Sequence, residues 1–408
     1  LPENPLVMIP WEDIGRYGGH LKYTEFTIGY DHYLRHLNES QLVEQVPEPG
    51  VAIYKWLDGT VQPGILEYWE QNEEATVFTL RIRKGLKWSD GVKVTTDDVR
   101  YCIEDVLFND AVNPILPEWA RWGGTSVLLE VVDTHTFRLT FGKPYGLFIS
   151  QMIGWRWHQL MLPAHYLKQF HRDYTPLEEL LPQMARYGYA ESDWGRFYLT
   201  MGGVGQAAGG FVPGRIPNIR DYPTLDPWLH IEQPNPGDYV LERNPYFYKI
   251  DPEGRQLPYM DGLRRTFVSD LQVQNLKILA SETDLQFQFV RLSDFPLFKR
   301  NELKSAYWVI PLPAWQDYML IFPLNLRPND PVLRPIMADI RFRQALSLAL
   351  NREEIKEALF LGFGRPAQLE PLPNSPWYDE AFAGAGVNYD PQQANRLLDE
   401  MGLVWDED

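Results

Sequence analysis

The sequence predicts a mixed α/β protein with more than one domain, and three observations support this fold class. The chain has 408 residues, which is enough for two or three domains with separate apolar cores. Short segments in which apolar and polar residues alternate, typical of half-buried strands, occur between residues 20 and 141. After residue 339 the apolar residues take helical spacing instead.

The first elements are predicted to be strands, followed by a sharply capped helix. A lead-in rich in Pro and Gly precedes HLKYTEFTIGY (20–30), which alternates as a first strand. FTLRI (78–82) is a second strand with one apolar face. Asp90-Gly91 supplies a turn, and Thr95 stands three residues before Asp98, the spacing of a helix N-cap with an acidic residue in the first turn. The predicted helix carries one apolar stripe, formed by Val99, Cys102, Ile103 and Val106.

Strands, helices and loops alternate through the rest of the chain. EVVDTHTFRLTF (130–141) predicts a strand with a turn, and residues 144–170 predict an aromatic helix-loop-helix. The glycine-rich MGGVGQAAGGFVPG lacks the context of a phosphate or dinucleotide site, so we interpret it as a loop. Beyond residue 339, Asn351 caps a second helix, which Gly362 and Gly364 end, and YDPQQANRLLDEMG predicts a last capped helix.

Composition excludes several classes of function. The net charge of −17, from 38 basic and 55 acidic residues, leaves no basic footprint for a nucleic acid and disfavours an anionic membrane surface. Cys102 is the single cysteine, so no internal disulfide can form, and no apolar run reaches membrane-spanning length. The 14 Trp, 22 Tyr and 20 Phe suit either aromatic-rich cores or surfaces that stack on sugars and peptides.

No assembled catalytic or metal-binding motif is present. Ser89 lacks the nucleophile-elbow context, and the eight His are scattered without a zinc-ligand spacing. The segment DPEGRQLPYMD contains Asp251, Glu253 and Asp261, but it lacks the alternating ligand pattern of a calcium loop. We therefore expect no catalysis, no metal and no cofactor, while a metal near 251–261 stays an open alternative.

Five segments, in order, resemble one protein family. They are FTLRIRKGLKWSDGVKVTTDDV, DYVLERNPYFYKIDPEGRQLPYMDGL, ILASETDLQF, DIRFRQALSLALNREEI and YDPQQANRLLDEMG. Together they resemble the motifs of the family 5 extracellular solute-binding proteins of bacterial ABC transporters, which include oligopeptide- and dipeptide-binding proteins. Asn351 departs from the pattern, since Asp is usual there. The long middle segment is similar to a subgroup with large chains.

The resemblance implies a periplasmic-binding-protein-like class II fold, with two large lobes around a cleft and a small scaffold lobe. We expect the first lobe in residues 1–45 and 166–268, the scaffold lobe in 46–165, and part of the second lobe in 269–408. Family members continue well beyond the last motif, so we expect the chain to be a fragment. The resemblance also implies a hinge that closes the lobes over the ligand.

The resemblance further suggests which aromatic residues face a ligand. By family position these are the loop after the first strand, the aromatic segments of the scaffold lobe and the strand entering the second lobe: Tyr30, Trp119, Trp122, Trp155, Trp157, Trp315 and Tyr318. No motif specifies any of them, so core packing is an equal alternative for each.

The leading functional hypothesis is an extracytoplasmic binding protein that delivers an oligopeptide, or a similar extended solute, to a membrane permease. We expect a monomer in the periplasm or at the cell surface, and whether the precursor is lipid-anchored stays open. An oligosaccharide ligand is the alternative within the family. A glycan-cleaving enzyme is the alternative from another class, but no motif places the two carboxylates that it needs.

Overall fold

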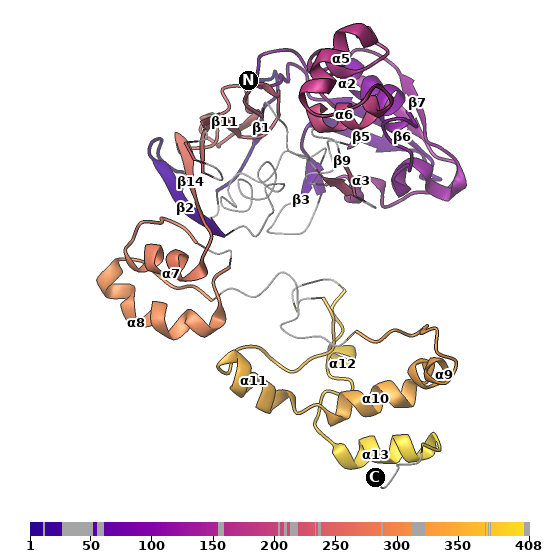
Figure 1. Cartoon of the computed structure of the whole chain (residues 1–408), viewed down its shortest axis with the longest axis vertical. Coiled ribbons are helices and arrows are strands. Elements are labelled where there is room, and N and C mark those ends of the chain that lie inside the picture. Colours follow the sequence, from indigo (N-terminus) through magenta and orange to yellow (C-terminus); the bar gives the residue numbers. More distant parts are fainter. Residues whose placement is uncertain are drawn as a thin grey trace. The chain divides into compact units, whose positions relative to one another are not determined.

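The computed structural model describes residues 1–10, 13–26, 52–54, 61–153, 159–202, 205–207, 210–212, 219–232, 234–235, 238–286, 289–311, 323–371, 373, 375 and 377–403. The chain divides into two compact units, Leu1–Phe289 and Val290–Asp408 (Figure 1). The first unit contains two four-stranded sheets, whereas the described part of the second is made of helices and loops.

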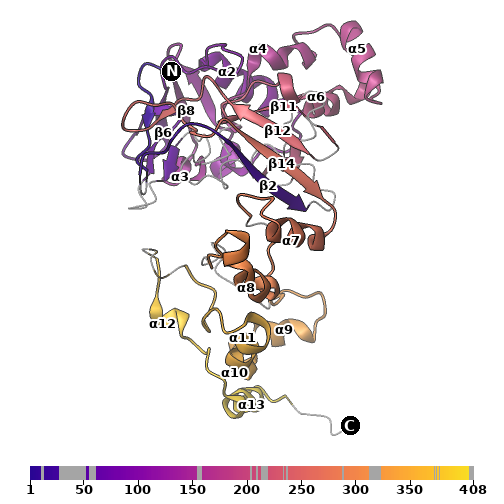
Figure 2. The ribbon, with the colours of Figure 1, turned by 90° about the vertical axis from the view of Figure 1, so that its left-hand side faces the viewer.

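One four-stranded sheet joins an early strand, β2, to strands more than 200 residues later. Its order is β11-β12-β14-β2, with β14 and β2 parallel and the other neighbours antiparallel (Figure 2). The strands are β2 (His20–Phe26), β11 (Trp228–Glu232), β12 (Tyr239–Arg243) and β14 (Gly262–Val268). A buried cluster including Tyr23, Trp228 and Leu263 covers one face, and helix α7 (Leu271–Leu279) packs against β2 and β14.

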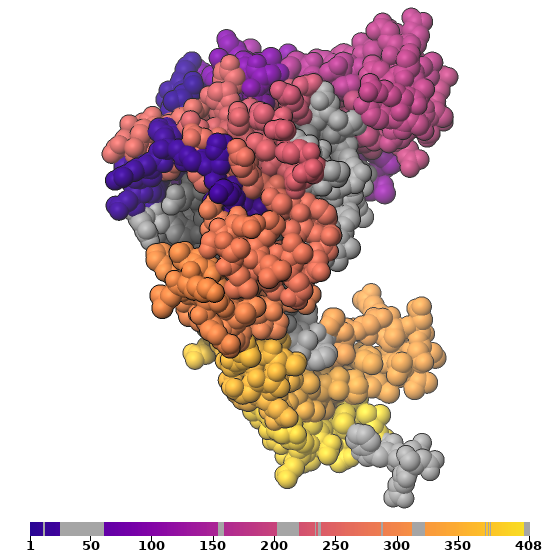
Figure 3. Space-filling model, turned by 60° about the vertical axis from the view of Figure 1, so that its left-hand side comes forward, coloured from indigo at the N-terminus to yellow at the C-terminus, as the bar shows by residue number. Residues whose placement is uncertain are grey.

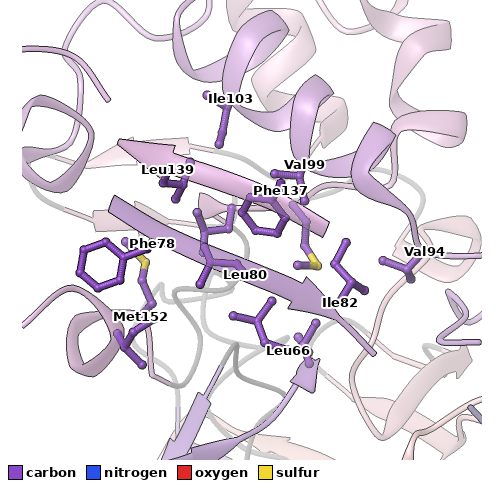
Figure 4. Close-up of a cluster of buried hydrophobic side chains, with 14 of the residues drawn as sticks. Leu66, Phe78, Leu80, Ile82, Val94, Val99, Ile103, Phe137, Leu139 and Met152 are labelled. Carbon is purple, nitrogen blue, oxygen red and sulfur yellow. The ribbon is translucent and has the colours of Figure 1, made fainter. Parts of the chain in front are cut away.

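The other four-stranded sheet is antiparallel throughout, in the order β5-β6-β8-β7. Its strands are β5 (Leu66–Gln71), β6 (Val77–Ile82), β7 (Leu128–Val131) and β8 (Thr136–Thr140). The predicted apolar face of β6 is confirmed, because Phe78, Leu80 and Ile82 are fully buried (Figure 4). Strands β2 and β6 thus belong to different sheets, as a separate scaffold lobe requires, while the lobe boundaries stay a prediction.

The predicted helix after Thr95 begins as expected and then changes form. Helix α2 (Thr96–Arg100) has a complete capping box formed by Thr95 and Asp98. It continues as the π-helical segment η1 (Tyr101–Leu107) rather than as an α-helix. All four residues of the predicted stripe are buried, but they face two cores: Val99 and Ile103 face one core, and Cys102 and Val106 face the other. The wider turn suits this division, because the π-helix repeats after more residues than the α-helix.

The second core of the first unit is built from short helices. Tyr101, Phe170, Met184 and Phe197 are among its buried members. The elements around this core are α4 (Ala164–Leu167), η4 (Lys168–Phe170), α5 (Leu177–Arg186), η5 (Glu191–Asp193), α6 (Trp194–Gly202) and η6 (Ile219–Asp221). The short helices η2 (Glu118–Gly124) and α3 (Phe148–Gln151) instead contribute buried residues to the core of the antiparallel sheet.

Three two-stranded pairs complete the first unit. They are β1 (Leu6–Val7) with β13 (Lys249–Ile250), β3 (Ala52–Tyr54) with β4 (Val61–Pro63), and β9 (Gly205–Ala207) with β10 (Gly210–Val212). The last pair lies in the glycine-rich segment, so the loop prediction was wrong there. Backbone pairing between short extended pieces does not depend on an apolar pattern, which is why the sequence did not reveal it.

The described helices of the second unit largely follow the predicted caps. Asn351 accepts the Glu354 N–H (3.2 Å) at the start of α11, and Asp390 accepts the Gln393 N–H (2.9 Å) at the start of α13. The elements are η7 (Leu292–Asp294), α8 (Phe295–Ser305), α9 (Leu333–Ala338), α10 (Ile340–Ala349), α11 (Arg352–Phe360), α12 (Glu380–Ala383) and α13 (Pro391–Glu400). In the described chain, no helix has the length and apolar character needed to span a bilayer.

Candidate functional site

The described residues include two of the seven predicted ligand-facing residues. Trp119 and Trp122 lie on η2, in the unit that contains the β5-β6-β8-β7 sheet. The other five predicted residues lie outside the described residues: Tyr30, Trp155, Trp157, Trp315 and Tyr318.

Trp119 is a core residue in this structure. Its side chain is 3% exposed and belongs to the buried cluster that includes Phe78, Leu80 and Phe137 of the antiparallel sheet. The ring lies 6.1 Å from that of Phe148, at a tilt of 40°. Packing therefore explains Trp119 without a ligand.

Trp122 is partly buried, and its position is held by two contacts. Its ring stacks on Tyr145 with 4.0 Å between centroids and 8° between planes. Its indole N–H donates a hydrogen bond to the Pro144 carbonyl oxygen (2.9 Å). The chain leaves helical geometry around Trp122, and Gly123 takes a left-handed φ of 71°. Trp122 is thus an aromatic side chain with restricted rotation that keeps some of its surface exposed, as a stacking contact requires. The sequence missed Tyr145 as its support, although this tyrosine belongs to the aromatic segment 144–170.

The chain approaches predicted residue Tyr30 along strand β2, which ends at Phe26. This strand is at one end of its sheet order, with β14 as its only strand partner among the described elements.

The segment that runs from strand β6 through the Asp90-Gly91 turn to helix α2 has polar residues with structural partners. The Ser89 hydroxyl oxygen accepts the Thr224 N–H (3.0 Å), and its own N–H donates to the Thr224 carbonyl (3.0 Å). His165 Nε2 lies 2.7 Å from an Asp90 carboxylate oxygen, so this His–Asp pair does not include the serine. These contacts tie the turn to neighbouring segments and do not assemble a nucleophile with a base.

Asp98, in the first turn of helix α2, is a carboxyl group whose pKa is strongly shifted. One oxygen accepts the Thr95 N–H (2.9 Å), and the other accepts the Ala164 N–H (3.0 Å). The side chain is almost completely buried. Burial raises the pKa of Asp98 to about 6, although the two N–H groups act in the opposite direction. The carboxyl group thus links the start of helix α2 to Ala164 through hydrogen bonds. Its burial disfavours the charged form, which reduces stability when the group is ionised.

Asp251, in the segment that is the candidate metal site of the sequence, has both carboxylate oxygens engaged by protein donors. They accept the N–H groups of Glu253 and Arg255 (2.9 Å each), the Arg255 guanidinium (2.8 Å) and the Tyr259 hydroxyl (2.8 Å). Within the described ranges, no group of three or more His, Cys, Asp or Glu side chains is placed to hold a metal ion.

Comparison with known proteins identifies the class and then the family. The sequence model of "Bacterial extracellular solute-binding proteins, family 5 Middle" matches residues 60–198 and 220–408. The chain therefore belongs to the family 5 solute-binding proteins, as its five motifs suggested. The fold is that of the periplasmic binding proteins, which confirms the expected fold class.

Individual relatives differ in what their names say they bind. The periplasmic alpha-galactoside-binding protein of Rhizobium meliloti is 24% identical over 360 residues, which is 84% of this chain and 46% of that protein. The periplasmic oligopeptide-binding protein OppA of Escherichia coli is 28% identical over 343 residues, 77% of this chain and 50% of that protein. The chain spans about half the length of these relatives.

Two solved structures cover the whole chain. An oligopeptide-binding protein OppA has a TM-score of 0.73 and 35% identity, and the match covers 61% of its length. The periplasmic binding protein MelB from Agrobacterium fabrum, in complex with stachyose, has a TM-score of 0.62 and 19% identity, and the match covers 59% of its length. The second likeness is one of fold alone.

Proposed function

We propose that this protein is the extracytoplasmic solute-binding component of an ABC importer, with an oligopeptide or a similar extended solute as its ligand. The observation that carries this proposal is the similarity to an oligopeptide-binding protein OppA at 35% identity over the whole chain. The protein binds its ligand without catalysis, as a monomer in the periplasm or at the cell surface, and delivers it to a membrane permease. The relatives named above support this role, because they are named as binding proteins.

The proposed binding mechanism is closure of two lobes over the ligand. The first lobe consists of residues 1–45 and 166–268, the scaffold lobe of 46–165, and the second lobe starts at about residue 269. The separation of the two four-stranded sheets supports the first two assignments. A ligand stabilises the closed form only through contacts that the open form lacks.

Within this proposal, Trp122 is the described residue best suited to contact a ligand. Its stack on Tyr145 and its bond to Pro144 leave little rotational freedom to lose on binding, which favours affinity. We expect Trp122→Leu to weaken ligand binding about tenfold, the order of one lost aromatic stacking contact. Tyr68→Leu, at an exposed aromatic residue outside the predicted set, is the matched control. Equal ligand affinities of the two variants would show that Trp122 does not contact the ligand.

An oligosaccharide ligand is the second candidate. The relative named as an alpha-galactoside-binding protein aligns over 84% of this chain, more than the 77% for OppA of Escherichia coli. Aromatic side chains stack on sugar faces as well as on peptides, so the 14 tryptophans agree with either ligand.

Native mass spectrometry of the protein isolated from its source separates these candidates. A co-purified peptide mass supports the first proposal, and an oligosaccharide mass supports the second. Calorimetry with a mixture of short peptides, and separately with stachyose, then tests each class directly. Binding of neither class would overturn both. Recovery of shortened glycans would support the glycan-cleaving alternative, because a transport protein releases its ligand unchanged.

A further inference from the structure

The loop between helices α11 and α12 carries a buried carboxylate that uses one of its two oxygens. Glu370 is 7% exposed, although it lies in a loop. Its oxygen Oε1 accepts a hydrogen bond from Arg365 Nη2 (2.5 Å). The other oxygen, Oε2, is buried as well, and no donor in the described part of the chain reaches it. Such an oxygen lowers stability, because it has lost its water and has gained no partner.

Tyr378 explains why Arg365 serves one oxygen only. An arginine and a carboxylate commonly form two parallel N–H···O bonds. Here the Arg365 guanidinium lies over the Tyr378 ring, 5.6 Å from its centroid, and Nη1 donates to the Tyr378 hydroxyl (3.4 Å). The guanidinium therefore divides its donors between two partners. The Arg365 side chain is 51% exposed, so it connects the buried carboxylate with the protein surface.

The neighbouring helices hold this loop in place. The Gln368 N–H donates to the Ala383 carbonyl (2.9 Å), at the end of α12. The Gln368 side-chain NH₂ donates to the Ala385 carbonyl (2.6 Å) and to the Ser347 hydroxyl (3.2 Å), which belongs to α10. In the space-filling view of Figure 3, yellow residues that follow α11 lie at the surface of the second unit. The Glu370 carboxylate is thus carried by a fixed loop, as a preorganised binding site requires.

Exposed apolar side chains adjoin the ion pair in the sequence. Leu369, which is 58% exposed, precedes Glu370, and Trp377, which is 80% exposed, precedes Tyr378. A tryptophan is seldom exposed to this extent. A basic side chain consists of an apolar stem and a cationic head, and its head is attracted to the face of an indole ring. A carboxylate with such neighbours therefore suits a basic side chain better than a small inorganic cation.

We propose that Glu370 receives the ammonium or guanidinium group of a basic side chain in the ligand, and that Arg365 is the resident cation which this group replaces. The proposal rests on the proposed function, because it takes the ligand to be a peptide. The exchange favours the ligand, since a cation that is not held by Tyr378 can donate to both carboxylate oxygens, whereas Arg365 donates to one. Arg365 gains contact with water in return. Glu370 then selects basic peptides over neutral ones.

Titration with n-butylguanidinium, followed by NMR of this probe, tests the site in the 408-residue chain. We expect saturable binding with a Kd of about 1 mM, the order for a ligand of about eight non-hydrogen atoms. The neutral n-butylurea, which has nearly the same shape, should bind at least about tenfold more weakly, because it brings no charge to the carboxylate. Equal binding of the two probes to the unmodified protein would overturn the proposal.

Two variants and one control assign the binding to Glu370. Glu370→Gln keeps an acceptor for Arg365 and removes the charge, so it should weaken binding of n-butylguanidinium at least about tenfold. Arg365→Ala removes the competing cation and should strengthen it about tenfold. The matched control is Glu380→Gln, at an exposed carboxylate of α12, and it should leave binding unchanged. Equal binding by the unmodified chain and Glu370→Gln would show a structural ion pair only, and would overturn the proposal.

Calorimetry with two tripeptides tests whether a ligand uses the site. One tripeptide contains lysine in the middle, and the other contains norleucine there, which has a side chain of similar length without the charge. We expect the lysine peptide to bind at least about tenfold more tightly, and Glu370→Gln to abolish this preference. Equal affinities would overturn the proposal while supporting peptide binding. Binding of n-butylguanidinium without binding of either peptide would support the cation site and count against the peptide ligand of the proposed function.

Discussion

Asp98 should make the stability of the protein change with pH in the direction opposite to that of most carboxyl groups. Its pKa is raised from 3.8 to about 6 by burial, so the folded protein holds this proton more tightly than the unfolded chain does. The contribution of Asp98 to stability is therefore complete below pH 3.8 and is lost as the pH rises through 6. The whole loss is about 3 kcal/mol, and acidification from pH 7 to pH 5 restores about 1 kcal/mol of it.

Replacement of Asp98 by Asn isolates this effect. The amide keeps one acceptor oxygen and places an NH₂ group against either the Thr95 or the Ala164 N–H, at a cost of about 1–3 kcal/mol that does not depend on pH. The stability of the unmodified protein, minus that of Asp98→Asn, should therefore increase by about 1 kcal/mol from pH 7 to pH 5.

Urea unfolding followed by tryptophan fluorescence at pH 7, 6 and 5 measures this difference. The matched control is Asp97→Asn, at a neighbouring side chain that is 76% exposed. A difference for Asp98→Asn that stays constant, or becomes smaller on acidification, would refute the assignment of burial as the dominant influence on this carboxyl group.

Three further predictions concern other residues of the first unit, Leu1–Phe289. Thr95→Ala removes the acceptor of the Asp97 N–H (3.3 Å) and should cost about 1 kcal/mol in chemical denaturation with unchanged ligand affinity; a tenfold loss of affinity at an unchanged Tm would contradict this. Burial lowers the pKa of His171, so its contribution to stability is present above pH 6.5 and is lost as the pH falls, and His171→Gln should reduce that acid sensitivity in melting curves; identical pH profiles would count against it. Burial raises the pKa of the Cys102 thiol, so Ellman's reagent should label it only as fast as the protein unfolds, and rapid labelling of the native protein would show that the thiol is accessible.

Local features of the fold were predictable from the sequence. Thr95 and Asp98 form the expected capping box, and Asn351 and Asp390 cap their helices, because a cap involves residues two or three positions apart. The apolar alternation of β6 was equally readable, since side chains of a strand alternate between its two faces.

The candidate site was less predictable. A tryptophan in an aromatic-rich sequence suits a core as well as a ligand surface, and only the structure separates the two for Trp119 and Trp122. The π-helical turn after Arg100 could not be predicted from the sequence either, because its residues pack into two cores that distant segments of the chain form. Spacing along the chain carries no information on which segments pack together.

The sequence by itself determined the family and the positions of the capped helices, through motifs and spacings that are complete within a few residues. The tertiary structure decided which side chains those elements meet: Ala164 at the Asp98 carboxylate, Tyr145 beneath Trp122, and the segment 284–286 along the edge of β2. The partners in the first and last of these contacts are 66 and 262 residues apart in the chain. Such contacts depend on the path of the whole backbone and on the burial that packing imposes, and neither is encoded in any local pattern.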